Sequence, residues 1–121
     1  MRASSDIDEE KQRLTVTFVG DVTFQEIIEW NRLKTAARVL NYPLLIDGRN
    51  AHLSVGDESL ADYVKMYQEN ASRSRLAPIA VVVDSEPEAA LLEKLLGCAT
   101  QWVKSRIFLD IDEARRWLGW S

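Results

Sequence analysis

The sequence predicts an α/β fold, with one mixed sheet of about five strands (an antiparallel hairpin, then β-α crossovers) and four helices. Segments with the apolar pattern of strands alternate along the chain with segments whose apolar residues recur at helical spacing. Strands that are separated by helices run parallel and are joined by right-handed crossovers. The two middle strands, 44–46 and 79–83, are apolar throughout, which predicts a sheet covered on both faces at its centre. A length of 121 residues fits a single domain, 1–121.

The first part of the chain predicts a hairpin and a helix. Residues 14–19 alternate between apolar and threonine side chains, and a weaker strand over 3–8 pairs with them through a turn at 9–12. Thr23 and Glu26 have the spacing of a capping box, in which each side chain bonds the other residue's backbone N–H. The helix that follows ends near residue 41, and its apolar stripe is Ile27, Trp30, Leu33, Ala37 and Leu40.

The middle of the chain predicts two strand–helix units. Pro43 opens the strand 44–46, and a polar loop over 47–54 leads to a helix whose apolar face is Leu60, Val64, Tyr67 and Ala71. Pro78 precedes the strand 79–83, and a long helix with Pro87 in its first turn comes next. The buried side of that helix is Leu92, Leu95, Leu96, Ala99, Trp102 and Val103.

The end of the chain predicts a short strand and a closing helix. Residues 106–109 alternate in polarity, and Asp110 is an N-cap with Glu113 three positions later. Gly119 is placed to end the helix in a left-handed conformation. The apolar stripe of this helix is Ile111, Ala114, Trp117 and Leu118.

With these elements in order, the chain resembles the SpoIIAA-like, or STAS-like, family of small bacterial proteins. The motifs that carry the resemblance are Thr23-Phe24-Gln25-Glu26 after Gly20, Leu44-Leu45-Ile46-Asp47, the strand 80–84, Arg106-Ile107-Phe108, Asp112-Glu113-Ala114 and Trp117-Leu118-Gly119. The resemblance extends over nearly the whole chain from Leu14 onward. It implies a mixed sheet with helical crossovers, related to the anti-sigma-factor antagonists and more distantly to the lipid-carrying CRAL-TRIO fold.

The sequence departs from the family's pattern at one functional position. Anti-sigma-factor antagonists carry a phosphorylated serine, in an Asp-Ser pair, shortly after the aspartate that ends the middle strand. The corresponding position here, counted from Asp47, is Val55-Gly56. Ser54 and Ser59 lie nearby, but neither follows an aspartate, so the phosphorylation site is not transferred to this chain.

Composition argues against several classes of function. The net charge is −4 and the pI is about 5.0, whereas nucleic-acid binding needs a basic face, so we expect no nucleic-acid partner. No apolar run approaches the roughly 20 residues of a membrane span, and the N-terminus has no signal-peptide pattern, so we expect no membrane span and a cytoplasmic location. Cys98 and His52 are single residues of their kinds, which argues against disulfides, zinc sites and catalytic triads. We therefore expect no metal and no cofactor.

Two polar features stand at the ends of the predicted strands. Aspartates follow four of them (Asp21, Asp47, Asp84 and Asp110), and in a parallel sheet they would share one rim, where Mg²⁺ or a phosphoryl group could bind. Aspartate is also the preferred residue for turns and helix caps, which is the simpler interpretation. The polar loop adds Arg49, Asn50, His52 and Ser54, which could contact an anionic ligand or a partner protein.

Aromatic residues predict either a core or a docking face. Tyr63, Met66 and Tyr67 fall on one predicted helix, and together with four tryptophans they suggest an apolar pocket or contact surface. Trp30, Trp102 and Trp117 lie on helical stripes and are expected in the core. Trp120 lies beyond the last helix, so we expect it to cover a sheet edge or to meet another subunit.

The function predicted first is a non-catalytic regulatory module of STAS-like type that binds another protein or a second copy of itself. The alternative is a carrier of a small apolar or lipid-like ligand, which needs an enclosed cavity of roughly 300 Å³ or more. A Mg²⁺-dependent aspartate phosphoacceptor is the third hypothesis. None of the three is an enzyme that turns over a substrate.

Overall fold

The structure is a computed structural model that describes residues 2–36, 41–54, 60–73, 76–97 and 103–120. The side chains of 2, 24, 34–36, 54, 60, 63, 67, 73, 91, 95 and 96 fall outside that description. The elements are β1 (Arg2–Asp8), β2 (Arg13–Thr23), α1 (Phe24–Ala36), β3 (Leu44–Ser54), α2 (Leu60–Arg73), β4 (Ile79–Val82), α3 (Glu86–Gly97), β5 (Ser105–Phe108) and α4 (Ile111–Trp117). This order confirms the predicted succession of strands and helices.

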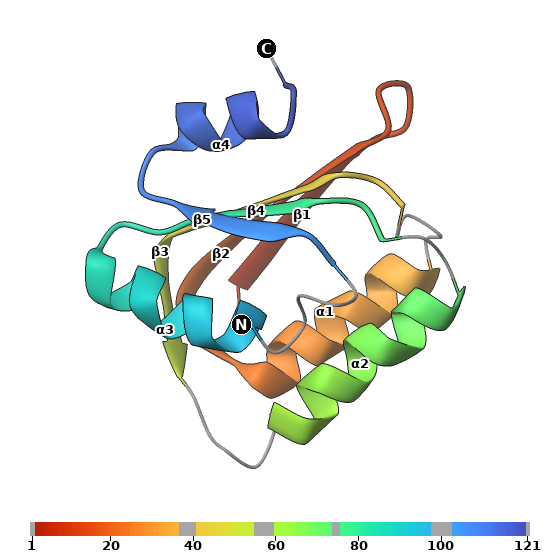
Figure 1. The fold of residues 1–121 in the computed structure, drawn as a ribbon, viewed down its shortest axis with the longest axis horizontal. Helices are drawn as coiled ribbons and strands as arrows, with labels where there is room; N and C mark the ends of the chain where they lie inside the picture. Colours follow the sequence, from red (N-terminus) through yellow and green to blue (C-terminus); the bar gives the residue numbers. More distant parts are fainter. Residues whose placement is uncertain (1, 37–40, 55–59, 74–75, 98–102, 121) are drawn as a thin grey trace.

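The five strands form one sheet in the order β1-β2-β3-β4-β5. The pair β1–β2 is antiparallel, and every other pair is parallel. Because each crossover moves one strand further in the same direction with the same hand, α1, α2 and α3 all fall on one face of the sheet. Figure 1 shows these three helices on one side of the sheet and α4 alone on the other. The mixed α/β fold class is therefore confirmed.

Two apolar clusters hold the helices to the sheet. The larger one lies on the face of α1–α3 and contains Leu14, Val16, Phe18, Leu44, Ile79 and Val81. The smaller one lies under α4 and contains Leu45, Ala80, Val82, Phe108, Ala114 and Trp120. Neighbouring residues of β3 and β4 thus alternate between the two clusters, as the apolar character of both strands predicted.

The prediction of a loop at 47–54 is wrong, because these residues continue β3 through a bulge. β3 runs to Ser54 and stays paired with β2, but the register of the pairing shifts within it. Thr17 pairs with Asp47, whereas Val19 pairs with Asn50. One extra residue therefore sits in β3, and the alternation of faces reverses after it. Leu44 and Ile46 face the larger cluster before the bulge, and Ala51 and Leu53 face it afterwards.

Local hydrogen bonds confirm the predicted caps at the starts of α1 and α4, and the end of α4 at Gly119. Thr23 Oγ1 accepts from the Glu26 N–H at 3.2 Å, and Glu26 Oε1 accepts from the Thr23 N–H at 3.2 Å, which completes the capping box. Asp110 Oδ1 accepts from the Asp112 N–H at 2.8 Å, and Gly119 has φ +80°. The long helix predicted to reach Val103 is α3, and Val103 is buried outside it, next to β5. None of the helices in the described part of the chain is both long and apolar enough to cross a membrane.

The predicted apolar stripe of α1 is confirmed at Trp30 and wrong at Leu33. Trp30 is buried as predicted, and Ile28 and Asn31 are buried beside it, but Leu33 is 69% exposed. The buried face is therefore rotated toward Asn31. Asn31 is satisfied there because its Oδ1 accepts a hydrogen bond from Asn70 Nδ2 of α2 at 2.8 Å. Ala37 and Leu40 of the predicted stripe lie outside the described residues.

Candidate functional site

A cavity of about 100 Å³ lies between the sheet and the layer of α1, α2 and α3. Its described walls are apolar apart from Asn31 and Glu88. The strands contribute Phe18, Val22, Leu53 and Val81 among others, and the helices contribute Ile27, Trp30, Met66 and Leu92. These wall residues come from β2, β3, β4 and all three helices of that face. The fold as a whole therefore shapes the cavity.

Trp30 is fixed in the wall by two contacts. Its indole ring meets the ring of Phe18 edge-on, with centroids 6.0 Å apart and an interplanar angle of 75°. Its Nε1–H donates to Ser5 Oγ of β1 at 3.1 Å, so the polar atom of the indole is satisfied without facing the cavity. The ring thus presents an apolar and well-positioned surface to the interior.

The reversed alternation after the β3 bulge supplies another part of the wall. Ala51 and Leu53 point toward α3 and the cavity, although a regular strand would have turned them to the other face. Gly48 lines the cavity at the bulge, where a Cβ would lie 3.3 Å from the Val82 carbonyl oxygen. Glycine is therefore the residue that lets β3 pass this close to the end of β4.

Glu88 and His52 form a polar contact beside the cavity. Glu88 lies in the first turn of α3, its side chain is 15% exposed, and it lines the cavity. Its Oε1 contacts His52 Nδ1 at the end of β3, and the His52 side chain is 66% exposed. The pair therefore connects the cavity wall with the protein surface.

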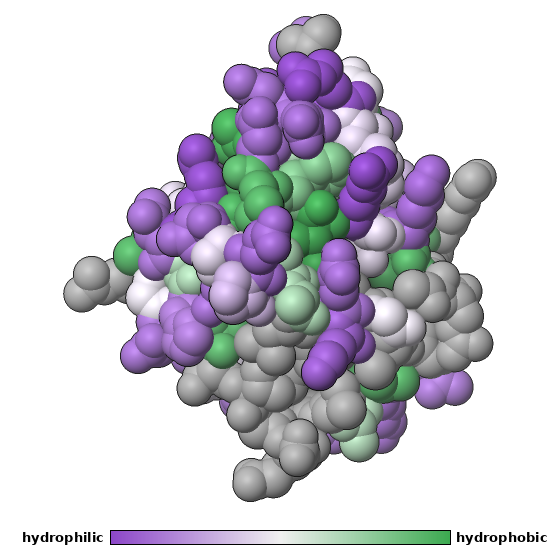
Figure 2. Space-filling model, turned by 60° about the vertical axis from the view of Figure 1, so that its left-hand side comes forward, coloured by the Kyte–Doolittle hydropathy of each residue, from purple (hydrophilic) through white to green (hydrophobic). Residues whose placement is uncertain are grey.

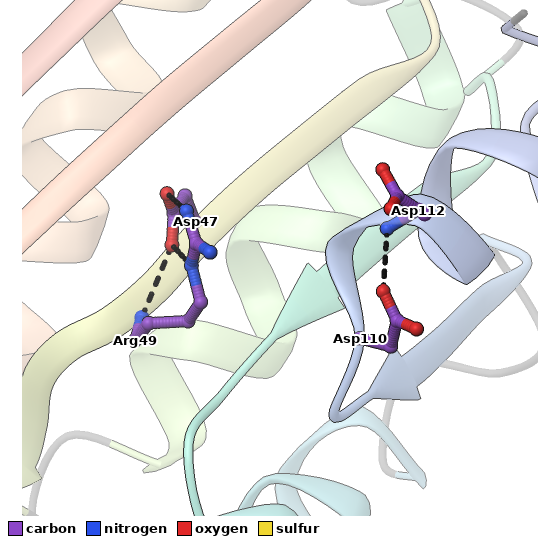
Figure 3. Close-up of polar contacts among 4 residues, drawn as sticks. All are labelled: Asp47, Arg49, Asp110 and Asp112. Carbon is purple, nitrogen blue, oxygen red and sulfur yellow. Dashed lines mark hydrogen bonds and ion pairs between the residues drawn. The ribbon is translucent and has the colours of Figure 1, made fainter.

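Asp47 and Arg49, two of the predicted site residues, bind each other across the bulge, as Figure 3 shows. Asp47 Oδ1 accepts hydrogen bonds from Arg49 Nε at 2.9 Å and from the backbone N–H of Arg49 at 3.2 Å. Asp47 Oδ2 accepts a hydrogen bond from Arg49 Nη2 at 2.8 Å. The hydrogen bonds from the Arg49 side chain hold the pKa of Asp47 below its ordinary value, against the opposing effect of partial burial. The same contact raises the pKa of Arg49. This ion pair joins the residues on either side of Gly48 in the bulge.

The structure does not gather the other predicted site residues at one place. Asn50 is exposed on β3 and pairs in register with Val19, and His52 pairs in register with Asp21. Ser54 ends β3, and Tyr63 and Tyr67 belong to α2, but the side chains of these three lie outside the described residues. Among the predicted site residues, Asp47 and Arg49 are the pair for which the structure describes a direct side-chain contact with each other.

Trp120 is buried against the sheet, which fits the first of the two expectations for it, covering the sheet, better than the second, meeting another subunit. It is 5% exposed and packs in the cluster under α4, where it covers the face of the sheet. The guanidinium carbon of Arg13 lies 5.1 Å from the centre of its ring and that of Arg115 lies 5.9 Å away. These contacts leave Trp120 little surface for another subunit.

The four strand-end aspartates have separate roles. Asp110 caps α4, Asp47 binds Arg49, and Asp21 and Asp84 are exposed. Within the described ranges, no group of three or more histidine, cysteine, aspartate or glutamate side chains is placed to hold a metal ion. Asp110 thus has the cap role of the simpler interpretation, whereas Asp47 forms an ion pair instead.

Comparison with known structures identifies the fold. A crystal structure of an uncharacterized protein from the DUF3478 family, from Shewanella loihica PV-4, superposes with a TM-score of 0.60 at 20% identity and covers 96% of this chain and 93% of that one. That protein is described as having a SpoIIAA-like fold. This chain has the SpoIIAA-like fold. No protein-family model and no curated protein matches the chain. The likeness therefore extends to the SpoIIAA-like fold, which the sequence resemblance predicted, and nothing in it indicates an enzyme.

Sequence reasoning missed two residues of the cavity wall, Asn31 and Glu88, and also Asn70, which bonds to Asn31. The sequence analysis singled out neither Asn31 nor Asn70, and Glu88 could be seen only as an acidic residue near a helix start. A polar residue at a buried helical position does leave a weak signal, because it interrupts an apolar stripe. Glu88 leaves none, since acidic residues are common in the first turn of any helix.

Proposed function

We propose that this protein binds a small apolar ligand, or the apolar end group of a larger one, in the cavity between its sheet and α1–α3. The apolar cavity of about 100 Å³ is the observation that carries the proposal. An apolar cavity of about 150 Å³ in another protein binds benzene and xenon, so a volume of this order holds a ring or a short chain. Rigid side chains such as Trp30 make the wall a fixed surface for such a ligand.

The cavity size sets the class of ligand. Pockets that enclose drug-sized ligands measure about 300–1,000 Å³, and this volume was expected for a lipid-like ligand. The cavity of about 100 Å³ is too small for a whole lipid. The proposal is therefore restricted to ligands, or apolar end groups, that are smaller than the lipid-like molecule predicted for a carrier.

Calorimetric titration with benzyl alcohol tests the proposal. We expect saturable binding at millimolar concentration or tighter, and loss of binding in Ala51→Leu, which adds a larger side chain to the wall. Ala90→Leu is the matched control because Ala90 is exposed on α3 and does not line the cavity. Absence of binding by the native protein, or equal binding by Ala51→Leu, would overturn the proposal.

Protein interaction stays a prediction of the sequence. Figure 2 shows apolar side chains gathered in the upper part of one face, bordered by hydrophilic ones. The exposed large hydrophobic residues among those described, however, lie in different parts of the chain: Ile7 in β1, Val19 in β2, Leu33 in α1 and Leu109 between β5 and α4. Single exposed apolar residues are common on protein surfaces, so they identify no partner. The phosphoacceptor hypothesis gains no support either, because the carboxylate of Asp47 is bound by Arg49.

A further inference from the structure

The cavity has a charged group on its apolar wall. Glu88 is the one ionisable residue among the described residues that line it. The carboxylate is mostly buried, with 15% of the side chain exposed, and His52 contacts one of its oxygens from the surface side. A carboxylate has two oxygens and about four acceptor positions, so a contact with one imidazole nitrogen leaves room for a further donor.

The position of Glu88 is not explained by the helix alone. Acidic side chains stabilise the first turn of a helix because the helix dipole is positive there. Glu86 lies in the same turn of α3, is exposed, and provides that stabilisation without contacting the cavity. Glu88 differs from Glu86 in being turned toward the apolar interior, where a carboxylate is less well solvated.

A carboxylate beside an apolar cavity discriminates between ligands by charge. Charges interact more strongly near apolar walls than in water, because the surroundings screen them less. A cationic or hydrogen-bond-donating end group next to Glu88 would be attracted, whereas a second carboxylate would be repelled and would also lose its hydration.

We infer that Glu88 selects ligands whose apolar part carries an amine, or a neutral hydrogen-bond donor, and rejects apolar carboxylic acids. The inference rests on the proposed function, since it assigns the chemistry of the end group to the same cavity. The apolar part occupies the space beside Trp30 and Met66, and the end group lies toward Glu88 and the surface.

Three probes of one size and different charge test this selectivity. Benzylamine, benzyl alcohol and benzoate each carry one ring, and their binding is measured by calorimetry and by the shifts of methyl signals from cavity residues. We expect benzylamine to bind at least tenfold more tightly than benzoate, with benzyl alcohol between them. Glu88→Gln is expected to remove the preference for the amine over the alcohol, whereas Glu86→Gln, the matched control in the same helical turn, retains it.

The outcomes separate the inference from the function on which it rests. If benzyl alcohol binds and benzoate binds as tightly as benzylamine, the charge selection is wrong and the apolar site stands. If the preference exists but is unchanged in Glu88→Gln, Glu88 is not its source and the inference is overturned. If none of the three probes binds to the native protein, the proposed function itself fails. The order of affinities in the native protein decides the first question even if Glu88→Gln does not fold.

Discussion

Trp120 lies beyond the last helix and is nevertheless buried. It follows the last turn of α4 in a Schellman arrangement, because the Trp120 N–H donates to the Arg115 carbonyl at 2.8 Å and the Gly119 N–H donates to the Arg116 carbonyl at 3.0 Å. The left-handed Gly119 turns the chain back, so the indole returns to Ala114 and the sheet. A residue beyond a helix is thus buried by the cap that ends the helix.

Replacement of Trp120 by alanine should destabilise the protein strongly. A buried aromatic residue replaced by alanine costs about 3–5 kcal/mol of the free energy of unfolding, because apolar contacts are lost and a cavity remains. Urea denaturation of Trp120→Ala measures this value. Leu109→Ala, at an exposed residue, should change the free energy by no more than about 0.5 kcal/mol. A change of similar small size in Trp120→Ala would contradict its placement in the core.

The ion pair of Asp47 and Arg49 predicts a dependence of stability on pH. Because the pKa of Asp47 is lower in the folded protein than in the unfolded chain, the unfolded chain binds the proton first as the pH falls. The stability from this contact is present above the ordinary aspartate pKa of about 3.9 and is lost as the pH falls through the folded value.

We therefore expect the native protein to be more stable than Asp47→Asn at pH 7, with the difference shrinking below about pH 4. Urea denaturation of both proteins between pH 7 and pH 2.5 measures it, with Asp84→Asn as a control at an exposed aspartate. A difference that does not vary over this range would show that the contact does not stabilise the folded state.

At the scale of elements, local signals were predictable and long-range ones were not. The capping box of Thr23 and Glu26 and the cap by Asp110 depend on residues two or three positions apart, so the sequence contains all of their chemistry. The bulge in β3 depends on pairing with β2, and at Gly48 it breaks the alternation that identifies a strand. The polar segment after Asp47 therefore resembled a loop in the sequence and is a strand in the structure.

The contact between α1 and α2 is a second long-range feature that could not be predicted from the sequence. Asn31 and Asn70 are both buried, and each provides the other with a hydrogen-bond partner from a different helix. Sequence periodicity assigns buried positions to apolar residues, so it placed Leu33 in the core instead. Pairs of buried polar residues far apart in the chain are not visible in a single sequence.

Asn70→Ala should lower the free energy of unfolding by about 1–3 kcal/mol, because it removes a buried hydrogen-bond partner of Asn31. A double-mutant cycle with Asn31→Ala isolates the interaction, for which we expect about 0.5–1.5 kcal/mol. Gln68→Ala, at an exposed position of α2, is the control and should change stability by less than about 0.5 kcal/mol. A coupling energy of zero would mean that the two amides do not stabilise each other.

At the scale of the whole molecule, the sheet has two unequal sides. One side is covered by α1, α2 and α3 and the other by α4 (Figure 1). The first side contains the cavity, and the second contains the smaller apolar cluster. The order of the strands within the sheet explains this division, because crossovers of one hand that all move in the same direction place successive helices on one face. The cavity itself was not predictable, since it is the space that side chains from six elements leave between them.

Xenon binding followed through the methyl signals of the protein tests the central claim most directly. Xenon is apolar and small enough for a cavity of this order, so it reports the space without regard to end-group chemistry. We predict that the shifted signals cluster on the cavity wall, at Val22, Leu53, Met66 and Leu92, and that Ala51→Leu removes these shifts while Ala90→Leu retains them. Shifts spread over the surface, or no shifts at these four residues, would contradict the account.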